Sequence, residues 1–171
     1  RREPHAGVHR ALVQMLKQDL GSTWMASLER HEILQFIFAR SGDAQDLGGY
    51  LLHTKLQENA LWLTEFSTNE LTKLSNHEIK QVRDAAQALF LRNLDRYRAA
   101  TNPGGHQEEL AQAVRLLDVN WDETREFYFK AFAEHFTAEE FTPGLLVSIC
   151  DSVRPDVQKF GRDMISHYFA D

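Results

Sequence analysis

Hydrophobic side chains recur along this chain with the period of an α-helix. In a run that begins at Ala44, small or apolar residues occupy most of the first, fourth, eighth, ninth and thirteenth positions. The same spacing appears four times, in Ala44–Leu56, Val82–Leu94, Thr124–Phe136 and Val157–Phe169. At 3.6 residues per turn these positions form one stripe of a helix. The pattern therefore predicts four equivalent amphipathic helices.

Each of these helices follows another segment with helical periodicity, so the chain is expected to form helix pairs. The first helices of the pairs are predicted at Trp24–Ala39, Asn69–Leu74, Gln107–Leu117 and Ala138–Ile149. Ser/Thr-x-x-Glu start signals occur at Ser67/Glu70, Ser75/Glu78 and Thr137/Glu140, where hydroxyl and carboxylate can satisfy the free amides of a first turn. An additional helix at about His5–Leu20, stopped by Gly21, would cover the first pair. No segment alternates with a period of two, so no strand is expected.

The fifth position of the stripe is very small in three of the four repeats, where it holds Gly48, Ala86 and Gly161. A small side chain lets a neighbouring helix approach closely. The packing gained in this way would offset the cost of Gly in a helix, which is about 1 kcal/mol relative to Ala. Tyr128 occupies the same position in the third repeat, which predicts looser packing or a different packing angle there. Gly49, the next residue of the first repeat, is expected on the outer face of its helix.

The segment Leu74–Ala86 (LSNHEIKQVRDAA) resembles the middle of a HEAT repeat, in which a polar turn leads into a helix that opens with Val-Arg and small residues. Asp151–Gly161 is similar, with Gln in place of Arg. The likeness is to HEAT-like α-solenoids of the bacterial type and covers about residues 24–170. It implies a right-handed α-α superhelix of about four helix pairs with an extra N-terminal helix. Armadillo-type arrays are the alternative, whereas the 34-residue tetratricopeptide period is not kept.

In HEAT families the Arg of this Val-Arg pair commonly binds an acidic residue at an inter-helix turn and so forms a ladder between repeats. The equivalent residues here are Gln45, Arg83, Arg125 and Gln158. The resemblance therefore implies at most half of such a ladder.

Composition and charge narrow the class of protein. The 171 residues are 43% hydrophobic and 26% charged, which predicts one folded domain over residues 1–171. Because Arg1 is not a methionine, we expect that domain to be a fragment of a longer protein. The net charge of -6 and the absence of a basic run argue against nucleic acid or an anionic membrane as partner.

The sequence also indicates a cellular compartment. No apolar run approaches the roughly 20 residues that span a membrane, and no signal-peptide core is present. Cys150 is the single cysteine and is interpreted as a buried structural thiol. These features predict a cytoplasmic protein.

No motif for catalysis, a cofactor or a metal is present. His5 and His9 have a spacing at which two imidazoles can share a metal, but further ligands are missing. The glycine pairs 48–49 and 104–105 lack the Lys-Ser/Thr of a phosphate-binding loop. We therefore predict no enzyme and no cofactor, although a catalytic site assembled from scattered residues stays an alternative, because such sites are recognised by geometry.

The third, seventh and tenth positions of the second helices point away from the apolar stripe and form a candidate binding face. They are Asp46, Tyr50, His53, Asp84, Ala88, Leu91, Glu126, Lys130, Ala133, Lys159, Asp163 and Ser166. Phe127, Tyr128 and Phe129 cannot all lie in one stripe, so Phe129 is expected to emerge as a partner anchor. The predicted partner-binding residues are Asp46, Tyr50, His53, Asp84, Leu91, Glu126, Phe129, Lys130, Lys159 and Asp163.

Stacked second helices of HEAT-like pairs line a concave surface, so the predicted function is a non-catalytic scaffold that binds a protein or peptide there. Asp46, Asp84 and Glu126 would favour a basic partner. The alternative is a HEAT-like DNA-binding protein with the architecture of the alkyl-base DNA glycosylases. The missing basic stripe argues against that alternative.

Overall fold

A computed structural model describes residue 14 and residues 21–169 of the chain. All regular structure in this part is helical. The α-helices are α2 (Gly21–Ala26), α3 (Arg30–Ile37), α4 (Gly42–Glu58), α5 (Thr68–Ser75), α6 (Lys80–Arg92), α7 (His106–Ala113), α8 (Asp122–His135), α9 (Pro143–Cys150) and α10 (Pro155–Phe169). The 3-10 helices are η1 (Leu61–Glu65), η2 (Leu94–Arg96) and η3 (Val114–Asp118). The predicted all-α class is confirmed.

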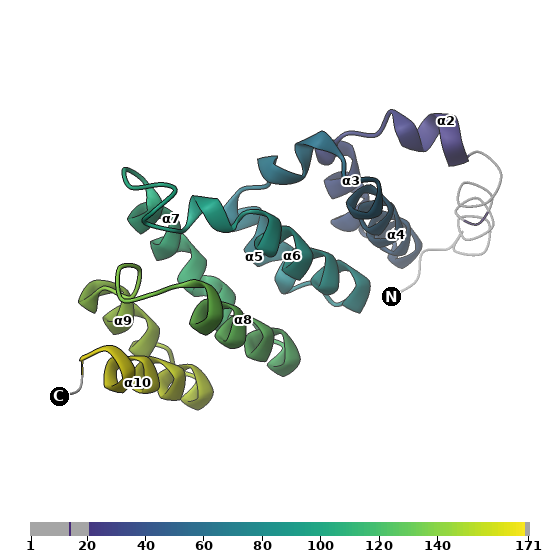
Figure 1. Ribbon diagram of the computed structural model, residues 1–171. Coiled ribbons are helices and arrows are strands. Elements are labelled where there is room, and N and C mark those ends of the chain that lie inside the picture. The colour runs from purple at the N-terminus through teal and green to yellow at the C-terminus, as the bar shows by residue number, and fades with distance from the viewer. Residues whose placement is uncertain (1–13, 15–20, 170–171) are drawn as a thin grey trace.

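The helices pack in consecutive pairs, as the periodicity predicted. Helix α3 packs on α4, α5 on α6 and α9 on α10, whereas α8 packs on η3, which continues α7. Neighbouring pairs touch through α4 with α6, through α6 with α8, and through α5, α7 and α9. Figure 1 shows the pairs following one another along the length of the molecule. Each pair therefore packs mainly against the pairs next to it.

Side-chain caps fix where several of these helices begin. Ser67 and Glu70 form the predicted capping box at the start of α5. Ser41 accepts a hydrogen bond from the amide of Ala44 at the start of α4, and Thr142 does the same for α9, where Pro143 follows it. These caps replace the hydrogen bonds that the first turn of a helix lacks.

Two predicted helix boundaries, within Trp24–Ala39 and at Ser75, are wrong. The segment Trp24–Ala39 is divided into α2 and α3, because Glu29 forms a capping box with Glu32 and starts a new helix. Ser75 starts no helix; it is the buried last residue of α5, and α6 begins at Lys80.

The third start signal, Thr137/Glu140, is present but does not start a helix. The Glu140 carboxylate accepts hydrogen bonds from the amide and hydroxyl of Thr137, at 2.8 and 3.0 Å. Helix α9 nevertheless begins only at Pro143. The predicted helix at His5–Leu20 lies outside the described residues, and Gly21 itself is helical.

Small residues do permit close helix approach within the pairs. A Cβ atom added to Gly48 would lie 2.7 Å from the backbone nitrogen of Ile37 on α3. At Gly161 the added atom would lie 2.6 Å from the Cys150 Sγ on α9. In the third pair Tyr128 is fully buried instead, and α8 lies against a short 3-10 helix. The second helix of the third pair therefore packs on a 3-10 helix, whereas the second helices of the other pairs pack on α-helices.

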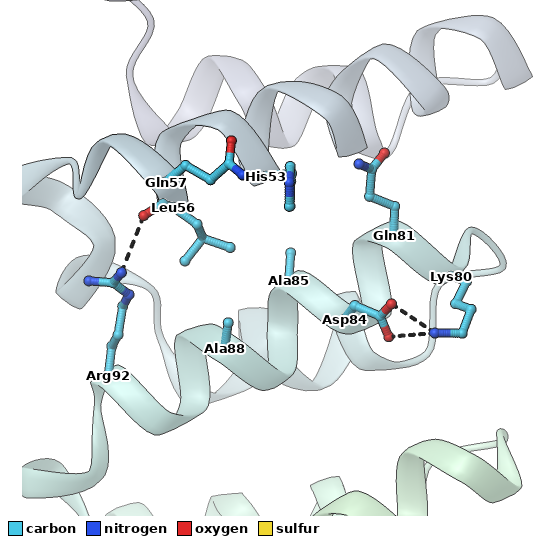
Figure 2. A pocket seen from close by; sticks show the side chains of 9 residues that line it. All are labelled: His53, Leu56, Gln57, Lys80, Gln81, Asp84, Ala85, Ala88 and Arg92. Atoms are coloured by element: carbon cyan, nitrogen blue, oxygen red, sulfur yellow. Dashed lines mark hydrogen bonds and ion pairs between the residues drawn. The ribbon is translucent and has the colours of Figure 1, made fainter.

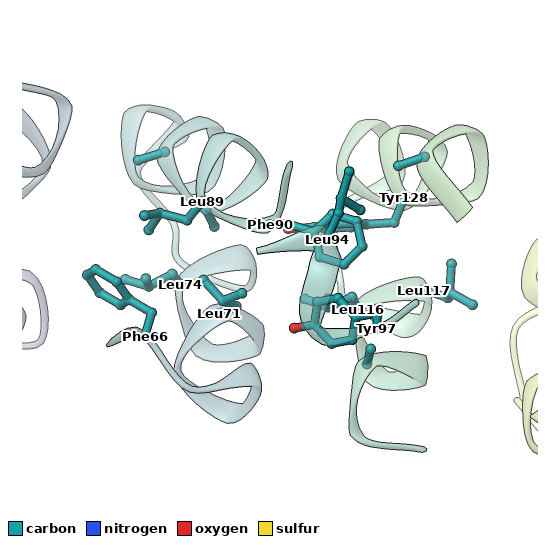
Figure 3. Close-up of a cluster of buried hydrophobic side chains, with 14 of the residues drawn as sticks. Phe66, Leu71, Leu74, Leu89, Phe90, Leu94, Tyr97, Leu116, Leu117 and Tyr128 are labelled. Atoms are coloured by element: carbon teal, nitrogen blue, oxygen red, sulfur yellow. The ribbon is translucent and has the colours of Figure 1, made fainter. Parts of the chain in front are cut away.

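Aromatic rings join the second and third pairs. Phe90 on α6 contacts Tyr97, Tyr128, Phe132 and Phe136, with ring centroids 5.3 to 6.4 Å apart. Figure 3 shows Phe90, Tyr97 and Tyr128 together with leucines of α5, α6 and η3. The tyrosine hydroxyls are satisfied, that of Tyr128 by Ser75 and that of Tyr97 by Thr68, each at 2.7 Å. Buried polar atoms paired in this way avoid the desolvation cost of an unmade hydrogen bond.

Candidate functional site

The site is positioned by a repeated contact at the turn inside each pair. The second residue of each of the four repeated segments donates a side-chain hydrogen bond to the backbone carbonyl six residues earlier. The four donors and acceptors are Gln45 to Ala39, Arg83 to His77, Arg125 to Val119 and Gln158 to Ser152, at 2.6 to 2.9 Å. Glutamine and arginine thus perform the same role within a pair.

Only the arginines also reach the next pair. Arg83 binds Glu123 at 3.0 Å, and Arg125 binds Asp156 at 2.8 Å. The Arg83 guanidinium also lies 3.8 Å from the ring centroid of Trp121. These two ion pairs join the second pair to the third and the third pair to the fourth.

In the joint between the first and second pairs the ion pair lies between the first helices, where Arg30 on α3 binds Glu70 on α5 at 2.6 Å. Gln45 takes the place of the arginine, and Gln81 stands where the other pairs have Glu123 and Asp156. His77 also connects these two pairs, because its Nε2 donates to the Ile37 carbonyl at 2.8 Å. The Nδ1 of His77 accepts from the Ile79 amide at 3.0 Å, at the start of α6.

The second and sixth positions of a second helix share one side, here called the trailing face. From this side Gly49, Arg83, Arg125 and Phe129 meet the next pair. This placement corrects two predictions. Gly49 is buried, not on the outer face, and an added Cβ atom would lie 3.2 Å from Val82 on α6. Phe129 does not emerge as an anchor; it is half-buried and stacks on Phe160 of α10, with centroids 4.9 Å apart. Both residues occupy the sixth position, which faces the following pair.

A groove of ≈ 540 Å³ lies between α4 and α6. It is lined by His53, Leu56, Gln57, Lys80, Gln81, Asp84, Ala85, Ala88 and Arg92. Figure 2 shows the two alanines and Leu56 in its middle, and polar side chains around them. The small alanine side chains on α6 leave this space open.

Charged groups stand at the two ends of the groove. At one end Lys80 pairs with Asp84 at 2.8 Å. At the other end Arg92 donates to the Leu56 carbonyl at 3.2 Å and to the Asn59 side chain, and so caps the end of α4. The three charged residues sum to one positive charge, which departs from the acidic character predicted for this face.

The predicted partner-binding residues divide into two groups. His53 and Asp84 line the groove, and Leu91 is exposed farther along α6. The others do not line it: Asp46 and Tyr50 on α4, Glu126, Phe129 and Lys130 on α8, and Lys159 and Asp163 on α10. Lys130 pairs with Glu134 and Lys159 with Asp163 within their own helices.

The groove also includes residues that sequence reasoning missed. Leu56 was assigned to the core alone, and Gln57 and Arg92 were not assigned to a site. Their positions relative to His53 depend on how far α4 lies from α6. The periodicity of a single helix carries no signal for that distance.

Neither side-chain chemistry nor likeness to known proteins assigns a ligand to the groove. Over residues 21–169, no three His, Cys, Asp or Glu side chains converge as a metal site would require. No helix in the same part of the chain is long and apolar enough to cross a membrane. No family model matches the chain, and neither the curated proteins nor the solved structures give a significant match.

Proposed function

We propose that this chain is a non-catalytic, HEAT-like α-solenoid module that holds a segment of a partner protein in the groove between α4 and α6. The observation that carries the proposal is the groove itself, which has an apolar centre and polar ends. A site of this kind fixes a ligand by apolar contact and orients it with a few polar groups. The repeated contacts at the turns support a stacked array beneath it.

The dimensions of the groove favour a short peptide segment. It extends along α6 from Lys80 to Arg92, which is about 18 Å at 1.5 Å per residue. About three helical turns would fill that length. An amphipathic helix could bring apolar side chains to Ala88 and Leu56, while His53 and Gln57 offer hydrogen bonds at the rim.

The charges of the groove make DNA a poor ligand. Lys80 is neutralised by Asp84, and Arg92 is engaged in capping α4. Nucleic acid binding depends on many cations facing the phosphates. The preference for a basic peptide is a separate part of the proposal, which rests on Glu126 and its exposed neighbours outside the groove.

The test is a selection of displayed 12-residue peptides on the protein, followed by calorimetric titration of the selected peptides. Ala88→Trp should weaken their binding at least about tenfold, because the indole fills the centre of the groove. Ala133→Trp, an exposed position on α8, is the matched control and should leave binding unchanged. Selected peptides that bind both variants equally would place the site elsewhere.

Fluorescence anisotropy with labelled duplex DNA at two salt concentrations tests the alternative. We expect no binding below millimolar concentration by the unmodified protein. If Asp84→Lys/Glu126→Lys binds DNA and the unmodified protein does not, the carboxylates disfavour DNA as proposed. Micromolar binding by the unmodified protein with a steep salt dependence would favour the DNA function.

A further inference from the structure

His77, in the turn between α5 and α6, uses both nitrogens of its ring. The Nε2 atom lies 2.8 Å from the carbonyl of Ile37, the last residue of α3. The Nδ1 atom lies 3.0 Å from the amide nitrogen of Ile79, the residue that precedes α6. A carbonyl can only accept a hydrogen bond and an amide N–H can only donate one. Both contacts together therefore require the neutral ring with its proton on Nε2.

A second proton on the ring is incompatible with this pair of contacts. It binds at Nδ1, whose lone pair accepts from the Ile79 amide. Two donors would then face each other, and turning the ring over does not help, because both nitrogens of a charged imidazole carry protons. The ring can keep its contact with Ile37 only if the Ile79 amide moves away from Nδ1.

Within residues 21–169, no carboxylate forms an ion pair with the His77 ring that would favour its charged form. The charged groups on the elements around the ring are Arg40 after α3, Asp43 and Asp46 on α4, Lys73 on α5, Glu78 in the same turn, and Lys80, Arg83 and Asp84 on α6. Asp84 is paired with Lys80. Arg83 donates to the His77 carbonyl at 2.9 Å and so places a cation on the same residue.

The second joint has a similar contact that cannot gain a proton. The Nε1 atom of Trp121 donates to the carbonyl of Asn76, at the end of α5, at 3.3 Å. In both joints a ring N–H in a turn thus binds a carbonyl at the end of the preceding first helix. An indole N–H is a donor only and does not titrate. The two ring contacts therefore differ in their response to acid.

The first joint also sets the spacing of the groove walls. Helix α6 is one wall, and α4, on which α3 packs, is the other. The walls approach closely near the start of α6, where a Cβ atom added to Gly49 would lie 3.2 Å from Val82. The ion pair between Arg30 and Glu70 holds the first helices at this joint. A change at His77 is therefore expected on the side of α4 and α6.

We propose that His77 makes the joint between the first and second pairs sensitive to pH. The neutral ring holds the start of α6 against the first pair, and the protonated ring releases it. Ligand binding in the groove weakens as the pH falls through the range in which histidines gain a proton, about pH 8 to 5. This effect on binding rests on the proposed function of the groove, whereas the effect on the joint does not.

Heteronuclear NMR of the 171-residue chain tests the joint directly. At about pH 8 the His77 ring should show the neutral form with its proton on Nε2. Acidification to about pH 5.5 should shift the Ile79 amide signal together with the His77 ring, and the Trp121 indole signal should change little. A neutral His77 ring with its proton on Nδ1, or an Ile79 amide that does not follow the ring, overturns the proposal.

Urea unfolding at the same two pH values tests whether the contact contributes to stability. His77→Gln keeps a side-chain N–H for Ile37 and does not titrate. The folding equilibrium constant of the unmodified chain should fall about fivefold more on acidification than that of His77→Gln, the effect of one lost hydrogen bond. His53→Gln, on α4, is the matched control and should fall as much as the unmodified chain. Equal falls in all three chains contradict the proposal.

Calorimetric titration of a groove-selected peptide at the two pH values tests the effect on binding. The affinity of the unmodified chain should fall about fivefold or more on acidification, and that of His77→Gln should fall less than about twofold. His53 lines the groove, so a fall that disappears in His53→Gln and persists in His77→Gln overturns the regulation of binding. If no peptide binds the groove at either pH, that regulation fails together with the proposed function, and the NMR and unfolding results still decide the joint.

Discussion

Single residues in this chain decide how closely helices approach. Gly161 is the clearest case, because an added Cβ atom would lie 2.6 Å from the Cys150 Sγ and 3.2 Å from its backbone nitrogen. Gly144, on α9, has open space where a Cβ atom would be. Both residues are glycines in helices, but only Gly144 can accept a larger side chain. The difference comes from the neighbouring atoms, which crowd Gly161 and are absent beside Gly144.

Gly161→Leu should therefore lower the free energy of unfolding by 1 to 3 kcal/mol or more, about the cost of overpacking a core. Gly144→Ala should be neutral or raise it by about 0.4 to 1 kcal/mol, because it removes flexibility from the unfolded chain. Urea unfolding followed by circular dichroism measures both. Equal losses in the two variants would contradict the packing of α9 on α10.

Glu140 is a buried carboxylate that connects two loops. Burial raises its pKa, but hydrogen bonds from the Ala99 amide and from the amide and hydroxyl of Thr137 lower it, and the net pKa lies below the ordinary 4.5. A lowered pKa stabilises the fold above the pKa of the unfolded chain, and the stabilisation is lost as pH falls through the folded value.

Glu140→Gln should accordingly reduce stability near neutral pH and flatten its decline below about pH 4.5, the ordinary value of this carboxyl group. Thermal unfolding between pH 3 and pH 7 measures the effect. Glu139→Gln changes an exposed carboxylate on the same turn and serves as the control. An unchanged pH profile in Glu140→Gln would show that Glu140 does not contribute.

At the scale of elements, the same hydrogen bond holds the turn inside every pair, whereas the contacts between neighbouring pairs differ. A glutamine suffices to bind the turn of its own pair, as Gln45 and Gln158 show. An arginine binds its turn and the next pair together, as Arg83 does through His77 and Glu123. The joint between the first two pairs relies on His77 and on the ion pair between Arg30 and Glu70.

Arg83→Ala should lower the free energy of unfolding by about 3 kcal/mol, because the His77 and Glu78 carbonyls lose a charged donor. Glu123→Gln should cost less than about 1 kcal/mol, since Glu123 is 54% exposed and screened by solvent. A double-mutant cycle in urea should give a favourable coupling of about 0.5 kcal/mol or more. Strictly additive losses would mean that the ion pair does not hold the joint.

At the scale of the whole molecule, Phe90 connects the second and third pairs through a cluster of aromatic rings. Its ring contacts two tyrosines and two phenylalanines from outside α6. In a stacked array, stability is the sum of terms for each unit and each interface. A loss at this joint should therefore weaken both pairs that share it.

Phe90→Ala should cost about 3 to 5 kcal/mol, the usual loss for a fully buried phenylalanine. Hydrogen exchange should then accelerate in α6 and α8 together. Leu61→Ala removes a side chain that is 97% exposed and should change neither measurement. Acceleration confined to α6 would contradict the cooperative joint.

The sequence by itself determined the helical class, the four amphipathic stripes and the close approach at Gly48 and Gly161. These features depend on the period of a single helix and on side-chain size, both of which are local. It also identified the outward positions at His53 and Asp84. Boundaries were less predictable, because Ser75 has the spacing of a start signal and was buried by Tyr128.

Only the tertiary structure decided which side of each second helix meets the next pair. Gly49 and Phe129 lie outside the apolar stripe of their own helices, so the periodicity predicted that they face solvent. In the folded chain both positions instead contact the next helix pair. The groove arises in the same way, because Leu56 and Arg92 become neighbours only when α4 and α6 take their places. Distances between separate helices depend on many packed side chains at once, whereas the stripe on one helix depends on its own residues alone.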